Sequence, residues 1–280
     1  MKSRRFVQCD VFSPIPTQGN GLAVVVDAEG LSDHQMQKFA AWTNLAETTF
    51  LLPPTDASAD YRVRIFTPVR EMLFAGHPTL GSCATWLHCG GKPKTAGLVR
   101  QECGVGIVDV DISQLGVLAF AAPPTTIQEM SSEKKESIIS ALAIPSQAIS
   151  HTAELCNGPT WQFFELKTAE QVLALDASKV RWPDFLGIGF LAPHPAGSEC
   201  DYEVRMLAPS SGMSEDPITG SLNAAIAKWL QSQGRLSKPY IAAQGTSIGR
   251  VGRVAVRSDP NGTAWIGGKV HIMIDGHLTL

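Results

Sequence analysis

Two segments of the chain, one in each half, repeat the same order of an arginine-led apolar run, a proline turn and a helix start. Arg64–Pro68 corresponds to Arg205–Pro209, and His77-Pro78 corresponds to Asp216-Pro217. The spacing from His77 to Asp216 is 139 residues, and a glycine-serine pair four residues further on repeats at the same spacing. Solenoid repeats are far shorter, about 20–50 residues. The duplication therefore predicts two similar domains that face each other across a cleft.

Further matches extend the repeat beyond one strand and one helix. Gln101–Gly106 corresponds to Gln244–Gly249 at a spacing of 143 residues. Ser32–Gln35 and Thr168–Gln171 begin 136 residues apart, and both have the pattern of a capping box, in which a hydroxyl and a glutamine satisfy backbone groups at a helix start. A near-constant spacing over several elements is hard to attribute to chance.

The same patterns set the domain boundaries and the fold class. The polar, proline-rich stretch Pro123–Glu136 is typical of a linker, so the predicted halves are residues 1–122 and 123–280, and the last strand is left free to cross back to the first half. Strands close together in sequence favour antiparallel or mixed pairing, hence an α+β fold. Two strongly apolar helices, 78–90 and 217–232, are each expected to be wrapped by their own sheet. The strands with the most regular patterns are Phe6–Phe12, Leu22–Val26, Glu47–Leu52, Tyr61–Phe66 and Tyr202–Leu207.

Composition and charge narrow the possible partners. The 280 residues are 44% hydrophobic and 18% charged, with a formal net charge of −3 and no block of like charge. These values exclude a disordered or coiled-coil chain and disfavour nucleic acid or an anionic membrane as a partner. No apolar run approaches the roughly 18 residues of a membrane helix, and no apolar segment follows the basic start Met1–Arg5, so neither a membrane span nor a signal peptide is expected.

Cysteine usage and missing motifs argue against cofactors. The six cysteines are scattered without a CxxC pair, which favours reduced thiols, a cytoplasmic protein and no zinc site. Neither a GxGxxG nor a P-loop motif occurs. We therefore expect activity without metal, nucleotide or flavin. Pyridoxal phosphate is also not expected, because no lysine lies near the motifs that carry the candidate site.

The two X-Pro pairs are candidates for binding chemistry. Asp216 before Pro217 is a good helix N-cap and needs no function to explain it, whereas His77 is a weaker cap. In the alternative, two helix N-termini with unpaired N–H groups and partial positive charge face one cleft and hold a carboxylate.

Glu47 is the candidate acid or base. It lies between Ala46 and Thr48 in an otherwise apolar segment. A carboxylate at a strand edge is often merely solvated, but partial burial would raise its pKa toward neutrality and suit it to proton transfer.

Five motifs in order give the chain a resemblance to a known family. It resembles the phenazine-biosynthesis PhzF-like family, whose fold is similar to that of diaminopimelate epimerase: two pseudo-symmetric halves, each a mixed β-barrel around a central helix, with the active site in the cleft between them. The motifs are Gly19–Val25, Asn44–Phe50, Arg64–Pro68, Phe74–Thr79 and Glu215–Ser221. The sequence departs from the family's pattern at Gly21, where proline is usual, and at Asn223, where many members carry histidine.

The resemblance implies cofactor-free isomerase chemistry on a small carboxylate-bearing molecule, in a homodimer. The namesake enzyme moves a proton within a dihydro-hydroxyanthranilate, and its glutamate matches Glu47. The resemblance assigns His77 and Asp216 to orient the substrate or that glutamate. It also implies that Gly76, Ser221 and the neighbouring Gly220 bind the substrate. Related epimerases use a cysteine from each half; no cysteine lies beside these helix starts, which disfavours a two-thiol mechanism.

Two further functional hypotheses stay open at this point. The chain could be a catalytically idle member that binds a metabolite or a partner protein. It could also be a lyase or hydrolase that uses the same acid or base, which product analysis would separate from an isomerase.

Overall fold

The computed structural model describes residues 2–114 and 116–280, and the chain divides into two compact units. Unit 1 comprises residues 1–121 and 267–280, and unit 2 comprises residues 122–266. The second half therefore ends at Ile266 rather than at Leu280, because the C-terminal segment returns to the first unit and pairs there with the N-terminal strand.

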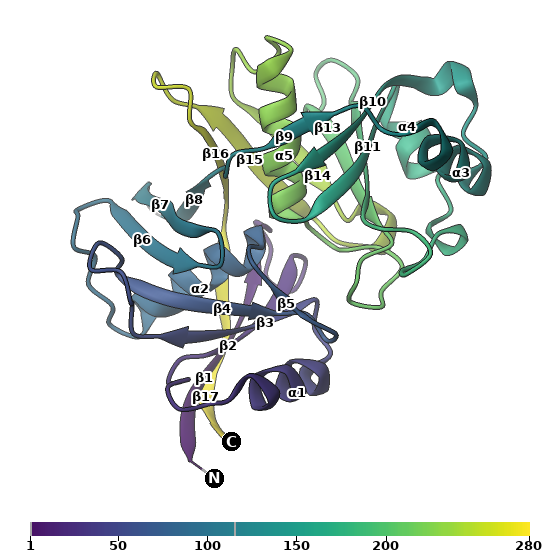
Figure 1. The fold of residues 1–280 in the computed structure, drawn as a ribbon. Helices are drawn as coiled ribbons and strands as arrows, with labels where there is room; N and C mark the ends of the chain where they lie inside the picture. Colours follow the sequence, from purple (N-terminus) through teal and green to yellow (C-terminus); the bar gives the residue numbers. More distant parts are fainter. Residues whose placement is uncertain (1, 115) are drawn as a thin grey trace. The chain divides into compact units, whose positions relative to one another are not determined.

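Unit 1 is a mixed sheet with two helices (Figure 1). Neighbouring strands run in the order β17-β1-β2-β3-β4-β6-β7-β8, and β5 pairs with β4. The pairs β2/β3 and β4/β6 are parallel and the others are antiparallel. The elements are β1 (Ser3–Val11), β2 (Asn20–Val25), α1 (Asp33–Thr43), β3 (Glu47–Leu52), β4 (Tyr61–Phe66), β5 (Glu71–Met72), α2 (Gly76–His88), β6 (Leu98–Cys103), β7 (Gly106–Gln114), β8 (Val117–Ala121) and β17 (Val270–Thr279).

Helix α2 is the centre of unit 1. It contacts β1, β2, β3, β6, β8 and β17, so strands surround it on several sides. Close packing against this helix requires a glycine at Gly81, where a Cβ would lie 2.5 Å from Leu22 Cδ2 and 2.8 Å from Cys9 Sγ. The predicted helix wrapped by its own sheet is therefore confirmed in this unit.

Unit 2 repeats the design with its own strands. Their order is β9-β10-β11-β12-β13-β14-β15, with β11/β12 and β13/β14 parallel. Ten of the thirteen residues of α5 are buried, and Figure 1 shows it among the strands of this unit. The elements are β9 (Thr126–Gln128), α3 (Ser132–Leu142), β10 (Ile149–Cys156), β11 (Thr160–Leu166), α4 (Ala169–Leu173), β12 (Ile188–Pro193), β13 (Tyr202–Leu207), α5 (Gly220–Ser232), β14 (Tyr240–Gln244), β15 (Gly252–Ser258) and β16 (Ala264–Gly268), with short 3₁₀ turns at Ser146–Ala148, Ala177–Lys179 and Thr246–Ile248.

The order of elements confirms the duplication. In unit 1, three antiparallel pairs, β1/β2, β3/β4 and β6/β7, are joined through α1 and α2. In unit 2, β10/β11, β12/β13 and β14/β15 are joined in the same way through α4 and α5. Both predicted capping boxes form, at Ser32 with Gln35 and at Thr168 with Gln171.

The structure corrects three boundaries. Helix α2 begins at Gly76, two residues before the predicted start, so Pro78 is its third residue; its missing N–H costs nothing there because the first four N–H groups have no partner within the helix. Helix α5 begins at Gly220, three residues after the predicted start. The stretch 123–136, predicted to be a linker, contains β9 and the first turn of α3.

Candidate active site

Glu47 opens β3 and lies against the first turn of α2. Parallel pairing places it opposite Leu22 of β2. Its side chain is 16% exposed, so the carboxylate is largely buried rather than solvated. Its Oε2 lies 3.3 Å from Nε2 of His77. The predicted acid or base and a residue predicted to orient it are therefore in contact.

His77 is the second residue of α2 and is 3% exposed. Burial removes the water that would solvate an imidazolium and lowers the pKa of His77 to about 3. At neutral pH the ring is therefore uncharged and carries a single N–H.

Asn20 decides which ring nitrogen carries that proton. Its Nδ2 lies 3.2 Å from Nδ1 of His77, and an amide NH₂ is a donor, so Nδ1 accepts. The hydrogen of the neutral ring is then on Nε2, the nitrogen that faces the Glu47 carboxylate. Asn20 is the first residue of β2, and β2 pairs with β3, which begins at Glu47. One sheet therefore positions both Asn20 and Glu47.

Gly76 is the first residue of α2, directly beside His77. The N-cap residue, Ala75, makes no side-chain capping hydrogen bond. Helix N-termini present N–H groups and a partial positive charge, so this end suits an anionic group such as a carboxylate. Gly76 thus lies at a helix N-terminus, and its role in substrate binding stays a prediction.

Asp216 is not a helix N-cap, so the interpretation of the Asp-Pro pair as a simple helix cap is wrong. It lies outside α5 and is 6% exposed. Thr219, the residue at the N-cap, donates from Oγ1 to Asp216 Oδ2 at 2.5 Å. The backbone N–H of Asp216 donates to the Met206 carbonyl at 3.0 Å, which ties this residue to β13.

Gln244 of β14 completes the support of this carboxylate. Its Nε2 donates to Thr219 Oγ1 at 3.0 Å and to the Asp216 carbonyl at 3.3 Å. Its Oε1 accepts from Thr219 N at 3.0 Å and from Asn223 Nδ2 at 2.9 Å. Donation runs from Gln244 through Thr219 to Asp216, so the Asp216 side chain accepts this hydrogen bond.

Gly220 and Ser221 are the first two residues of α5. Thr219 makes no side-chain capping bond to the helix, since its hydroxyl serves Asp216. Asn157, directly after β10, donates from Nδ2 to the Ser221 carbonyl at 2.8 Å and fixes this turn. Within unit 2, Asp216, Gly220 and Ser221 therefore lie within one short segment at a helix start, as the sequence predicted.

Sequence reasoning missed several supporting residues. Asn20, Thr219 and Gln244 contact the predicted groups directly, but none was singled out as a site residue. The signal was present, because Asn20 and Thr219 belong to the quoted motifs and Gln244 belongs to the matched pair Gln101–Gly106 and Gln244–Gly249.

All six cysteines are free. Burial raises the pKa of Cys9 to about 12 and raises that of Cys83 further, which leaves both as thiols at neutral pH. Within residues 2–114 and 116–280, no three His, Cys, Asp or Glu side chains are grouped to hold a metal ion. In the same part of the chain, no helix is long and apolar enough to cross a membrane.

Comparison with known proteins gives one family and several relatives. The model of the PhzC-PhzF family, described as phenazine biosynthesis-like protein, matches residues 9–276. The chain is 34% identical to Antisense-enhancing sequence 1 of Schizosaccharomyces pombe, with 99% of each chain covered. It is 31% identical to trans-2,3-dihydro-3-hydroxyanthranilate isomerase of Pseudomonas aeruginosa, covering 92% of this chain and 91% of that protein. Among solved structures, a Bacillus anthracis phenazine biosynthesis protein of the PhzF family has a TM-score of 0.82 at 20% identity, with 100% of both chains covered.

Proposed function

The chain belongs to the phenazine biosynthesis-like family, and from this premise we propose that it is a cofactor-independent isomerase that moves a proton on a small carboxylate-bearing substrate. The observation that carries the proposal is the Glu47 carboxylate held 3.3 Å from a buried, neutral His77. The name of the Pseudomonas aeruginosa relative supports the reaction class.

Each group has a defined task in this proposal. Glu47 takes a proton from a carbon that an adjacent double bond or carbonyl makes acidic, and it returns the proton at another carbon, so no electrons are gained or lost overall. His77 presents Nε2 to the carboxylate at 3.3 Å, and we assign it the task of orienting Glu47. The start of α2 at Gly76 and the start of α5 at Gly220 and Ser221 bind the carboxylate of the substrate through backbone N–H groups.

Asp216 is proposed to orient the substrate as an anchored hydrogen-bond acceptor. Its contact with Thr219 and the tie to β13 leave it little freedom, which suits a positioning task. The proposal assigns Glu47 and Asp216 to one substrate through their chemistry, and the kinetics of the Glu47→Gln and Asp216→Asn variants test that assignment.

The experiment follows deuterium entering a carbon acid. The probe is trans-2,3-dihydro-3-hydroxyanthranilate in D₂O, read by NMR and mass spectrometry. We expect a product of the mass of the substrate plus any deuterium gained; a gain or loss of water instead identifies a hydrolase or lyase.

The Glu47→Gln variant removes the acid or base and is expected to lower the rate by about 10²–10⁴-fold. The matched control is Glu71→Gln, which removes a half-exposed carboxylate from an ion pair in the same unit. A Glu47→Gln variant that keeps the wild-type rate contradicts the assignment of Glu47.

A second candidate function is a catalytically idle binding protein. The observation in its favour is the relative from Schizosaccharomyces pombe, which is 34% identical and whose name describes no reaction. Calorimetric binding of the same probe without deuterium entry would support this second function and contradict the isomerase.

We also propose that the protein is a cytoplasmic homodimer without a nucleic-acid or membrane partner. The net charge of −3 disfavours nucleic acid and anionic membranes as partners, and six free cysteines suit a reducing compartment. Twofold dimers are the commonest oligomers. Equilibrium sedimentation should give twice the chain mass of 30.0 kDa, and a mass near 30.0 kDa contradicts the dimer.

A further inference from the structure

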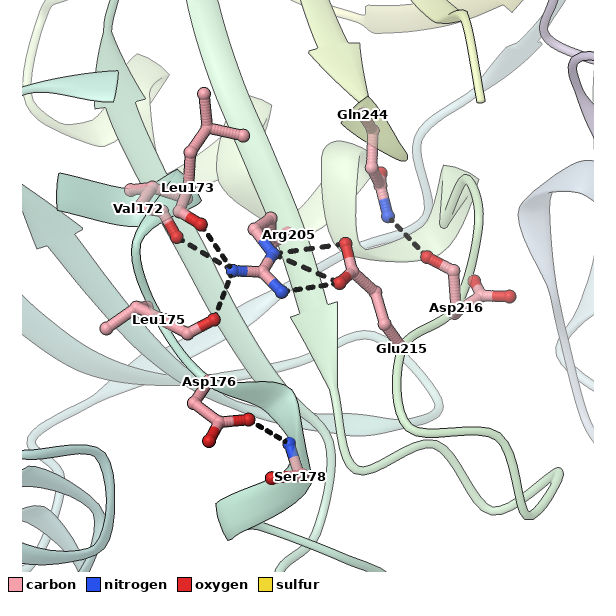
Figure 2. Close-up of polar contacts among 9 residues, drawn as sticks. All are labelled: Val172, Leu173, Leu175, Asp176, Ser178, Arg205, Glu215, Asp216 and Gln244. Atoms are coloured by element: carbon pink, nitrogen blue, oxygen red, sulfur yellow. Dashed lines mark hydrogen bonds and ion pairs between the residues drawn. The ribbon is translucent and has the colours of Figure 1, made fainter. Parts of the chain in front are cut away.

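A buried ion pair lies directly behind Asp216, and the proposed chemistry does not use it. Arg205 of β13 donates from Nε to both carboxylate oxygens of Glu215 at 3.1 Å and from Nη2 to Oε2 at 2.6 Å (Figure 2). The side chains are 3% and 0% exposed. Two charges so completely removed from water need an explanation, because desolvation offsets much of their attraction.

The remaining guanidinium nitrogen of Arg205, Nη1, contacts the backbone of residues 172–175. Nη1 donates to the carbonyl oxygens of Val172 at 2.9 Å and Leu175 at 2.8 Å, with Leu173 at 3.4 Å (Figure 2). Val172 and Leu173 are the last two residues of α4, and Leu175 follows its C-cap residue Ala174. One side chain therefore joins β13, the end of α4 and the segment that precedes α5.

The segment that precedes α5, residues 208–219, contains Asp216. Glu215 is its immediate neighbour in sequence and forms a bridge to Leu207 at the end of β13. The Asp216 N–H donates to Met206, and Gln244 holds the Asp216 carbonyl from β14. The backbone of Asp216 is thus fixed from both neighbouring strands, and the Arg205–Glu215 pair sets where the segment returns to β13.

We propose that Arg205 and Glu215 are positioning residues for Asp216: their ion pair fixes the backbone of the segment 208–219 so that the Asp216 carboxylate keeps one orientation. The inference rests on the proposed function, which places Asp216 on the substrate. An ion pair of this kind is suited to positioning, because a bidentate contact between arginine and a carboxylate fixes the angle between the two groups as well as their distance.

The duplication supplies an internal control. In unit 1, Arg64 holds Glu71 with the same fork, Nε to Oε1 and Nη2 to Oε2, both at 2.7 Å. That pair is more exposed, at 20% and 42%, and the residue after Glu71 is Met72, whose side chain carries no acid or base. Glu71→Gln therefore removes the corresponding ion pair of unit 1 without touching a proposed site residue.

The first test measures the mobility of the segment and needs no substrate. In Glu215→Gln, amide hydrogen exchange of a peptide covering residues 208–219 should be faster by about tenfold or more, while Glu71→Gln leaves it unchanged. Arg205→Lys keeps the charge but loses the fork, and it carries the test if Glu215→Gln does not fold. Unchanged exchange in a folded Glu215→Gln or Arg205→Lys overturns the proposal.

The second test is a double-mutant cycle with Asp216→Asn, using trans-2,3-dihydro-3-hydroxyanthranilate as substrate. Glu215→Gln should lower kcat by about 10–100-fold with little change in KM, and it should change kcat by less than about twofold when Asp216 is already Asn. Equal losses in both backgrounds indicate a general structural role and overturn the proposal.

The two tests separate this inference from the proposed function. An Asp216→Asn variant with wild-type kcat contradicts the role of Asp216 in the reaction. The exchange measurement still judges the ion pair, because faster exchange in Glu215→Gln supports the positioning of the segment and unchanged exchange refutes it, whatever the kinetics show.

Discussion

Acidification is expected to lower the free energy of unfolding more in the wild-type protein than in a His77→Gln variant, because His77 is buried as a neutral ring. The pKa of His77 is about 3 in the folded state and 6.5 for an unperturbed histidine. Below pH 6.5 the unfolded chain takes up a proton that the folded chain does not bind. The contribution of His77 to stability is therefore fully present above its pKa in the unfolded chain, and it is lost as the pH decreases toward 3.

The magnitude follows from the same two values. Each pH unit between them costs about 1.4 kcal/mol, so the wild type should lose about 2 kcal/mol between about pH 7.5 and pH 5 through His77 alone. Gln has no titrating group, and the remaining six histidines are shared by both proteins, so their contributions cancel in the comparison.

The assay is urea unfolding at several pH values and constant ionic strength, followed by tryptophan fluorescence. The difference in the free energy of unfolding between wild type and His77→Gln should shrink by about 2 kcal/mol over this range. Parallel curves would mean that burial does not depress the pKa of His77. A difference that grows on acidification would mean that the Glu47 charge stabilises an imidazolium, and the neutral donor assigned to His77 would then be wrong.

Three other perturbations test the packing and the chemistry. Gly81→Ala places a methyl group against Leu22 and Cys9 and should cost about 1–3 kcal/mol by urea unfolding; an unchanged midpoint would show that the α2 contact yields easily. Ser32→Ala removes one side of the first capping box and should cost about 1 kcal/mol in the same assay, whereas no loss would mean that the cap contributes nothing. Turnover should survive exhaustive dialysis against a chelator, and a loss restored by one metal ion would refute the cofactor-free mechanism.

Sequence patterns were sufficient to predict those elements whose structure depends on neighbouring residues in the chain. The alternating run Tyr61–Phe66 and the segment Glu47–Leu52 form strands with the predicted bounds. The capping boxes form because a hydroxyl and a glutamine three residues apart satisfy each other's backbone within one turn. The duplication, read from spacing alone, also predicted which helices take equivalent places in the two units.

Contacts between residues far apart in the sequence determine the helix starts and the side-chain contacts that the local patterns did not predict. A proline fits any position of a first helical turn, so Pro78 alone does not say where α2 begins. In the irregular segment before α5, the side chain of Gln244 in β14 pairs with backbone groups: it accepts from Thr219 N and donates to the Asp216 carbonyl. Asn20 meets His77 from 57 residues away, a contact that spacing does not encode.

The two copies of one motif have diverged through the position of the helix start. In unit 1 the X-Pro pair lies inside α2, so His77 is buried and its ring is neutral. In unit 2 the pair lies before α5, so Asp216 stays outside the helix and is held by hydrogen bonds from β13 and β14. A shift of a few residues relative to the helix thus leaves a neutral imidazole in one unit and an anchored carboxyl group in the other. The proposed isomerase assigns the first to orienting Glu47 and the second to orienting the substrate.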